Sequence, residues 1–217
     1  MLNSWKNELL IYRVVLDKKV ILIGYSGHAF VVVEAVLENG LEIIGYSDKE
    51  PSDINPYNLS YLGFEKDDDF IGWEEEVSFV LGIGDNKLRQ NIAHLIENKG
   101  KSVETIIHKT ANISKNAEIR NGSFINKNVV VNALAVVGKS VILNTGCIIE
   151  HECVLADAVH IGPGAVLAGN VSVGERTFVG ANAVIKQGIV IGKDVVIGAG
   201  TVVITNIPDG KKVVGNP

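Results

Sequence analysis

The most regular feature of the chain is an aliphatic residue at every sixth position of its second half. Stepping by six from Ile113 to Val203 gives sixteen positions, and all sixteen hold an aliphatic residue. Four residues after most of them, a small or β-branched side chain follows. A period of six fits neither an α-helix nor an alternating strand, but it fits a solenoid whose short strands turn a corner in each hexad. Three hexads make one triangular coil, so the pattern predicts about five coils of eighteen residues.

Glycine and asparagine recur where the corners are expected, as at Gly138 and Gly174. We expect such residues to supply the permissive backbone that a sharp turn needs. The pattern resembles the hexapeptide-repeat, left-handed parallel β-helix family of acyltransferases. For the periodicity alone, a non-catalytic scaffold solenoid is the alternative.

The first half follows a different pattern, in which apolar runs alternate with amphipathic segments. Strands are predicted over 18–24, 41–48, 77–86 and 102–108, and helices over 29–40 and 87–100. Strands that alternate with helices predict a small, Rossmann-like parallel α/β sheet. The acidic stretch 65–76 is expected to be a solvated loop and short helix without a function.

Three units follow from these patterns. Residues 1–18 form an N-terminal extension with a helix expected over 5–15, residues 19–108 form the α/β domain, and residues 109–217 form the β-helix.

Composition narrows the possible functions. The chain has 217 residues, 47% of them hydrophobic, and a net charge of -5, which leaves no basic surface for nucleic acid. The N-terminus is too polar for a signal peptide, and no apolar run approaches the roughly 20 residues of a membrane span. Only two cysteines occur, Cys147 and Cys153, which fits a reducing compartment. We therefore expect a cytoplasmic protein.

The glycine turn after the first strand is the first candidate binding site. Gly24, Ser26, Gly27 and His28 lie where backbone N–H groups and a helix N-terminus can meet an anion such as a pyrophosphate. The spacing is not that of the dinucleotide fingerprint, so an ordinary strand-to-helix connection is the alternative. Asp48 follows the second strand, where an acid commonly meets a ribose or base, and a turn aspartate is the alternative.

A resemblance covers nearly the whole chain from Lys19 onward. It is carried by the segments GYSGHAFVVVE, GIGDNKLRQ, IIHKTANIS and above all VILNTGCIIEHECVLADAVHIGPGAVLAGN. These segments are similar to the sugar acetyltransferases of the bacillosamine pathway (PglD type) and their NeuD-like relatives. The resemblance implies a UDP-sugar-binding N-terminal domain, a β-helix that binds acetyl-CoA, and a homotrimer.

The same resemblance implies the catalytic residues. His151 matches the catalytic histidine, Glu152 its acidic partner, His160 a second active-site histidine, and Gly169 the backbone donor to the acetyl carbonyl. Gly169 follows His151 by one coil of eighteen residues, so the two are expected to stack at an exposed edge. His160 lies half a coil from His151, and we expect a trimer to bring it towards His151 of a neighbouring chain.

The chemistry suits these residue types. Imidazole titrates near neutral pH and is a suitable base for a sugar amine, while Glu152 would fix the tautomer of His151. The predicted reaction is N-acetylation of a UDP-linked 4-amino-4,6-dideoxy sugar. The alternative is O-acetylation of a sialic-acid-like sugar. A zinc carbonic anhydrase is disfavoured because the β-helix holds only two histidines, and no metal is expected.

The remaining expected contacts concern the two substrates. Acetyl-CoA is expected to run beside the small residues Gly169, Ala181 and Gly198, with Lys186 or Lys211 near its phosphates. From His160 onward basic residues exceed acidic ones by two, which reverses the sign of the whole chain. His160 is also assigned to this cofactor site, and Asn144 to the sugar substrate.

Overall fold

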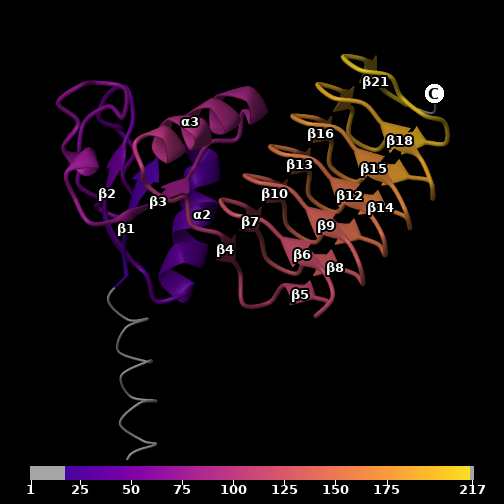
Figure 1. Ribbon diagram of the computed structural model, residues 1–217, viewed down its shortest axis with the longest axis horizontal. Helices are drawn as coiled ribbons and strands as arrows, with labels where there is room; N and C mark the ends of the chain where they lie inside the picture. Colours follow the sequence, from indigo (N-terminus) through magenta and orange to yellow (C-terminus); the bar gives the residue numbers. More distant parts are fainter. Residues whose placement is uncertain (1–17, 216–217) are drawn as a thin grey trace, which may run out of the picture.

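The computed structural model describes residues 18–215, which form an α/β domain beside a stack of solenoid coils (Figure 1). The N-terminal helix expected over 5–15 lies outside the described residues. None of the helices in residues 18–215 is long and apolar enough to cross a membrane.

The N-terminal domain is the predicted small parallel sheet. Its strands lie in the order β2-β1-β3 and all run parallel. Along β1, Val20 and Leu22 pack towards α2, whereas Ile21 and Ile23 pack towards α3, so both faces of the sheet are buried. The elements in chain order are β1 (Lys19–Ile23), α2 (Gly27–Glu38), β2 (Glu42–Ser47), the 3-10 turn η1 (Ile71–Trp73), β3 (Ser78–Leu81) and α3 (Asn86–Asn98).

The rest of the described chain is a parallel β-solenoid with three flat sheets, as the hexad pattern predicts. Sheet 1 consists of β4 (Ile106–Ile107), β7 (Phe124–Ile125), β10 (Ile142–Leu143), β13 (His160–Ile161), β16 (Phe178–Val179), β19 (Val196–Ile197) and β21 (Lys212–Val213). Sheet 2 consists of β5 (Asn112–Ile113), β8 (Val130–Val131), β11 (Ile148–Ile149), β14 (Val166–Leu167), β17 (Val184–Ile185) and β20 (Val202–Val203). Sheet 3 consists of β6 (Glu118–Ile119), β9 (Val136–Val137), β12 (Val154–Leu155), β15 (Ser172–Val173) and β18 (Val190–Ile191).

The aliphatic positions of the hexads point inward. From Ile125 to Val203 every one of them is at most 2% exposed, and Cys147 and Cys153 fill two of the small inward positions. The solenoid begins one hexad earlier than expected, because Ile106–Ile107 pairs with Phe124–Ile125 of sheet 1 and not with the α/β sheet. Within the segment 102–108, Val103 forms an isolated β-bridge with Phe79 of the α/β domain. With β21 at the other end, the three sheets hold seven, six and five strands, which make about six coils, whereas the hexads from Ile113 to Val203 predicted about five.

Gly138 and Gly174 serve a different purpose from the one expected. The left-handed backbone lies two residues after them, at Ser140 (φ 53°) and Arg176 (φ 58°). Gly138 and Gly174 are required instead by close stacking of the coils. A Cβ at Gly138 would lie 2.7 Å from the carbonyl carbon of Ala156, and one at Gly174 2.5 Å from that of Gly192.

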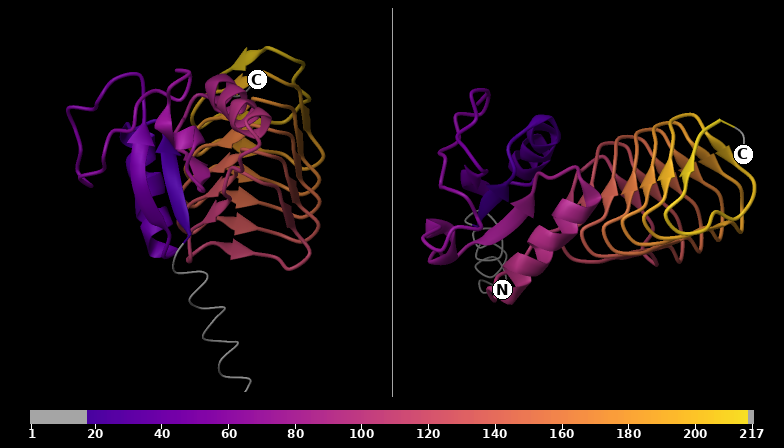
Figure 2. Two further views of the ribbon diagram at one scale, coloured as in Figure 1. Left: turned by 60° about the vertical axis from the view of Figure 1, so that its left-hand side comes forward. Right: turned by 90° about the horizontal axis from the view of Figure 1, so that it is seen from above.

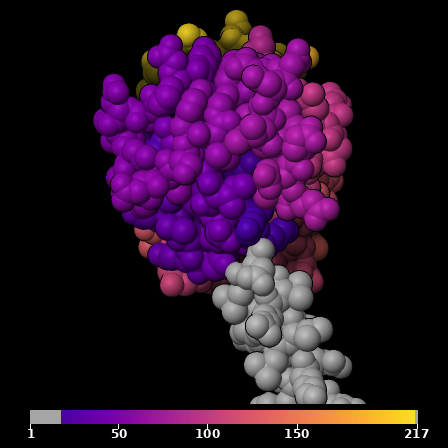
Figure 3. Space-filling model, turned by 90° about the vertical axis from the view of Figure 1, so that its left-hand side faces the viewer, coloured from indigo at the N-terminus to yellow at the C-terminus, as the bar shows by residue number. Residues whose placement is uncertain are grey.

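The N-terminal domain packs on the outer face of sheet 1 (Figure 2). Ile106, Phe124 and Ile142, which point outward from successive coils, are buried in one cluster with α2. Ion pairs flank this apolar contact, between Lys127 and Glu34 at 2.7 Å and between Lys139 and Glu97 at 2.9 Å. Seen from this side, the domain covers much of the solenoid behind it (Figure 3).

Candidate functional site

A histidine and a glutamate share the exposed corner between β11 and β12. Nδ1 of His151 lies 3.1 Å from Oε2 of Glu152, and their side chains are 50% and 58% exposed. Glu152 has φ 61°, which turns the chain sharply at this point. In a neutral imidazole whose Nδ1–H donates to Glu152, Nε2 carries the free lone pair. The corner therefore presents an oriented, accessible base.

Gly169 stacks on this corner from the next coil, as the eighteen-residue period predicts. The N–H of Asn170 donates to the carbonyl oxygen of His151 at 2.8 Å. A Cβ at Gly169 would lie 2.5 Å from Nε2 of His151, so only glycine leaves room for the imidazole as it stands. No acceptor in the described part of the chain binds the Gly169 N–H. That N–H is thus available to an oxygen atom placed beside the imidazole.

Both cysteines near this corner are packing residues, as their inward positions predict. Burial raises the pKa of the Cys147 thiol to about 12 and also raises the pKa of Cys153. A thiol with a raised pKa is a poor nucleophile at neutral pH. Within residues 18–215, no group of three or more His, Cys, Asp or Glu side chains is arranged to hold a metal ion.

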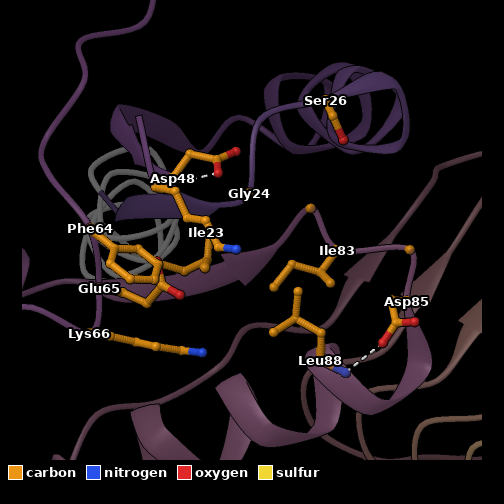
Figure 4. A pocket seen from close by; sticks show the side chains of 13 residues that line it. Ile23, Gly24, Ser26, Asp48, Phe64, Glu65, Lys66, Ile83, Asp85 and Leu88 are labelled. Atoms are coloured by element: carbon orange, nitrogen blue, oxygen red, sulfur yellow. Dashed lines mark hydrogen bonds between the residues drawn. The ribbon is translucent and has the colours of Figure 1, made fainter. Parts of the chain in front are cut away.

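The α/β domain carries a cavity of about 400 Å³ at the carboxyl ends of its three strands (Figure 4). Three of the predicted residues line it: Gly24, Ser26 and Asp48. Ligands bind at this edge in open parallel sheets generally. The other lining residues come from the segment after β2 and from the β3–α3 turn, and they are Phe64–Lys66, Gly82–Asp85 and Leu88, together with Ile23 and Lys49.

Asp48 holds the glycine turn in place. Its carboxylate accepts from the N–H of Tyr25 at 2.9 Å and from that of Lys49 at 2.7 Å. Gly24 has φ 83°, a conformation that favours glycine. No side chain caps the start of α2 at Ser26. The first N–H groups of α2, at one edge of the cavity, therefore remain free to meet an anion.

The acidic segment 65–76 contributes more than a solvated loop, which corrects the expectation for it. Glu65 is 5% exposed, and its carboxylate accepts from the Ser47 hydroxyl at 2.7 Å. Phe64, Glu65 and Lys66 all line the cavity. The pattern of polar and apolar residues could not predict this contribution to the cavity, because it depends on how the segment crosses the carboxyl ends of the strands.

His28 and His160 lie between the two domains of the same chain, and not where the sequence placed them. His28 does not line the cavity; its ring lies 5.7 Å from that of Phe124 and 6.1 Å from that of His160. His160 is 9% exposed, so it is not free to face a neighbouring chain. Burial, followed by the charge of Arg89, lowers the pKa of His28 to about 4 and that of His160 to about 3. Both rings are neutral at physiological pH.

The residues expected along acetyl-CoA lie at different corners of the solenoid. Lys186 follows β17, one coil beyond Ala168, and so shares the corner of Gly169. Ala181 and Gly198 follow β16 and β19, at the corner between sheets 1 and 2. Gly169 and Lys186 therefore share one corner of the solenoid, and Ala181 and Gly198 share another.

Two other predicted residues, Asn144 and Lys211, lie outside the cavity of the α/β domain. Asn144 accepts from the side-chain amide of Asn126 at 3.0 Å and does not line the cavity. Lys211 precedes β21, at the corner between sheets 3 and 1.

The cavity and the base are on opposite sides of one chain. The α/β domain covers sheet 1, whereas His151 occupies the corner where sheets 2 and 3 meet, and in a three-sided coil that corner is opposite sheet 1. A ligand in the cavity does not reach His151 of the same chain.

Comparisons with known proteins agree with this division into two parts. Residues 19–96 match the family model of the PglD N-terminal domain, and residues 170–205 match that of the hexapeptide repeat of succinyl-transferase. Among curated proteins, none matches the sequence significantly.

Solved structures resemble the chain over nearly its whole length. A mutant of perosamine N-acetyltransferase from Caulobacter crescentus, in complex with CoA and GDP-perosamine, is 34% identical, with a TM-score of 0.85 over 91% of this chain and 93% of that one. The acetyltransferase domain of PglB from Neisseria gonorrhoeae, in complex with acetyl coenzyme A, is 31% identical, with a TM-score of 0.85 over 93% and 98%. WeeI from Acinetobacter baumannii, 23% identical with a TM-score of 0.78 over 93% and 98%, shares the fold.

Proposed function

The chain belongs to the family of acetyltransferases that join a PglD N-terminal domain to a hexapeptide-repeat solenoid, and from this premise we propose that it N-acetylates a nucleotide-linked amino sugar with acetyl-CoA. The acceptor is the amine of a UDP-linked 4-amino-4,6-dideoxy sugar. The observation that carries the proposal is the oriented His151–Glu152 pair stacked against the free N–H of Gly169.

In the proposed mechanism His151 acts as the general base. Nε2 takes a proton from the sugar amine as its nitrogen attacks the thioester carbonyl carbon, and the carbon–sulfur bond then breaks to release CoA, which takes up a proton. Glu152 stabilises the imidazolium that forms. The N–H of Gly169 donates to the carbonyl oxygen as negative charge develops on it. Loss of one such donor typically costs about 10²–10³-fold in rate.

The proposal requires more than one chain at the site, because the cavity and His151 lie on opposite sides of a subunit. Sheet 2 offers a surface for association. Its outward side chains stack in register as an apolar stripe of Val130, Ile148, Val166, Val184 and Val202. Val184 is 42% and Val202 39% exposed, and a contiguous exposed apolar stripe marks a candidate surface for association. We propose that a homotrimer buries this stripe and brings the cavity of one chain to His151 of the next.

A direct assay tests the function. Purified full-length protein is incubated with acetyl-CoA and a panel of UDP- and GDP-linked amino sugars together with a sialic-acid-like sugar, and free CoA and the acetylated product are measured. Turnover with a UDP-linked 4-amino sugar is expected. Turnover only with a GDP-linked sugar would show that the proposed nucleotide of the substrate is wrong. Turnover only with a sialic-acid-like sugar would identify an O-acetyltransferase.

The assembly has its own test. Light scattering on the active protein is expected to give the mass of three chains, and Val184→Asp is expected to shift it towards the monomer and abolish turnover. An active monomer would overturn the proposed trimer.

A further inference from the structure

Arg89, in the first turns of α3, is a buried cation bound almost entirely by carbonyl oxygens. It is 1% exposed. Its Nη2 donates to the side-chain oxygen of Asn86 at 2.9 Å, and its other acceptors are all backbone carbonyls. Among residues 18–215, no carboxylate forms an ion pair with it. Burial of a charge without an opposite charge is costly, so a role for it is expected.

The guanidinium connects the cavity wall to two coils of the solenoid. Nη1 donates to the carbonyls of Ile83 at 3.2 Å and Gly84 at 3.0 Å, both of which line the cavity. Nε donates to the carbonyl of Ser140 at 2.8 Å, and Nη2 to that of Ala158 at 2.9 Å. Arg89 thus fixes the β3–α3 turn against the solenoid.

The same hydrogen bonds orient the backbone of that turn. In a trans peptide the C=O and N–H point in opposite directions, and no peptide bond in the described residues is cis. When the carbonyls of Ile83 and Gly84 point at Arg89, the N–H groups of Gly84 and Asp85 point away from it. Neither N–H has an acceptor in the part of the chain that the structure describes, and both residues line the cavity.

The charge of Arg89 remains unneutralised near this turn. Burial lowers the pKa of Arg89 to about 9, so the side chain is still protonated at neutral pH. The acid that acts on it most is Asp85, which is exposed and whose Oδ1 accepts from the N–H of Leu88 at 2.7 Å. The field of Arg89 is felt by its neighbours, since it contributes to the lowered pKa of His28 and of His160.

We propose that Arg89 is a positioning residue for the diphosphate of the nucleotide sugar: it aims the N–H groups of Gly84 and Asp85 and supplies a buried positive charge that favours the anion without touching it. This inference rests on the proposed function, and it assigns the diphosphate to the β3–α3 side of the cavity. The glycine turn of residues 24–28 is then not the sole anion-binding element.

The test compares ligands that differ in phosphate charge. Dissociation constants for a nucleoside diphosphate and the matching monophosphate, UDP with UMP and GDP with GMP, are measured by calorimetry on the full chain and on Arg89→Gln. Loss of the charge is expected to weaken binding of the diphosphate by about tenfold or more and binding of the monophosphate much less. The ratio of the two dissociation constants, which measures the preference for the diphosphate, should therefore shrink. Because the charge is buried, the difference should persist at high salt. A purely structural role would weaken both ligands equally and leave the preference unchanged.

Two further variants keep the test decisive. Arg120→Gln removes an equal charge from an exposed arginine paired with Glu118, and it should change neither constant. Arg89→Lys keeps the charge but cannot hold both carbonyls of the turn. This variant should bind both nucleotides more weakly but keep the preference for the diphosphate. It takes the place of Arg89→Gln in the test if Arg89→Gln does not fold. Loss of the preference in Arg89→Lys, or an unchanged preference in folded Arg89→Gln, would overturn the inference. If wild-type protein binds neither nucleotide, the proposed function itself fails.

Discussion

The contact between Gly169 and the imidazole of His151 makes Gly169→Ala an informative perturbation. Gly169 does not have a left-handed φ, so alanine brings no backbone strain. Its Cβ would stand 2.5 Å from Nε2 of His151. Unstrained contacts between such atoms are about 3.5 Å, so the ring must retreat by about 1 Å. His151 is 50% exposed and has room to move, so the cost in unfolding free energy should stay below about 1 kcal/mol.

The catalytic cost should be much larger than the cost in stability. A base displaced by about 1 Å from its productive position typically loses about 10²-fold in rate, so kcat is expected to fall by that factor while thermal unfolding changes little. The assay is steady-state acetyl transfer, with circular dichroism melts on the same samples.

A double-mutant cycle separates displacement of the ring from obstruction of the thioester. In a His151→Ala background there is no imidazole to displace, so Gly169→Ala should have little further effect on the residual rate. An equal loss of kcat in both backgrounds would refute the argument, because the methyl group would then act on the substrate. Near-normal kcat in the single variant would refute it as well.

Three other predictions follow from the site and its surroundings. His151→Ala alone should lower kcat by about 10²-fold or more with the fold retained, and near-normal turnover would remove His151 from the mechanism. Replacing both Lys186 and Lys211 with glutamine should raise KM for acetyl-CoA, more at low salt than at high salt. A change confined to KM for the nucleotide sugar would show that the two substrates are assigned to the wrong ends of the active site. The pKa values of His28 (about 4) and His160 (about 3) lie below the ordinary histidine value of 6.5. The unfolded chain therefore binds more protons below pH 6.5, and stability should fall as the pH drops from there towards 4. Each histidine would account for roughly 2 kcal/mol at pH 5, so urea unfolding at pH 7 and pH 5 should show a smaller drop for His160→Gln than for wild type, and an equal drop would contradict the assignment.

The solenoid and the stacking at the corner of His151 could be predicted because both depend on a fixed repeat. Once the coil has eighteen residues, Gly169 must stack on His151, and the inward positions of Cys147 and Cys153 follow from the hexad alone. These relations are local in the coil and do not depend on what packs outside it.

The parts that the sequence did not predict depend on contacts between distant segments. Nothing in the repeat says which of three similar sheets the α/β domain covers, so His160, an outward residue of sheet 1, was expected to be accessible and is instead buried. The contributions of Glu65 and Arg89 were missed for the same reason. Glu65 looked like part of a solvated acidic run, and Arg89 like a polar position of an amphipathic helix, until the loops converged at the strand ends.

The repetition of the solenoid raises a question of alignment for any domain that packs on it. Ser140 and Ala158, whose carbonyls bind Arg89, are eighteen residues apart and occupy equivalent places in consecutive coils. The next coil presents an equivalent backbone carbonyl. If the α/β domain moved along the solenoid by one coil, Arg89 could therefore form the same hydrogen bonds. Side chains that differ from coil to coil distinguish between these positions. Examples are the ion pairs of Lys127 with Glu34 and of Lys139 with Glu97. Side-chain contacts of this kind help to select the height at which the α/β domain sits on the solenoid and, in the proposed trimer, its distance from His151 of a neighbouring chain.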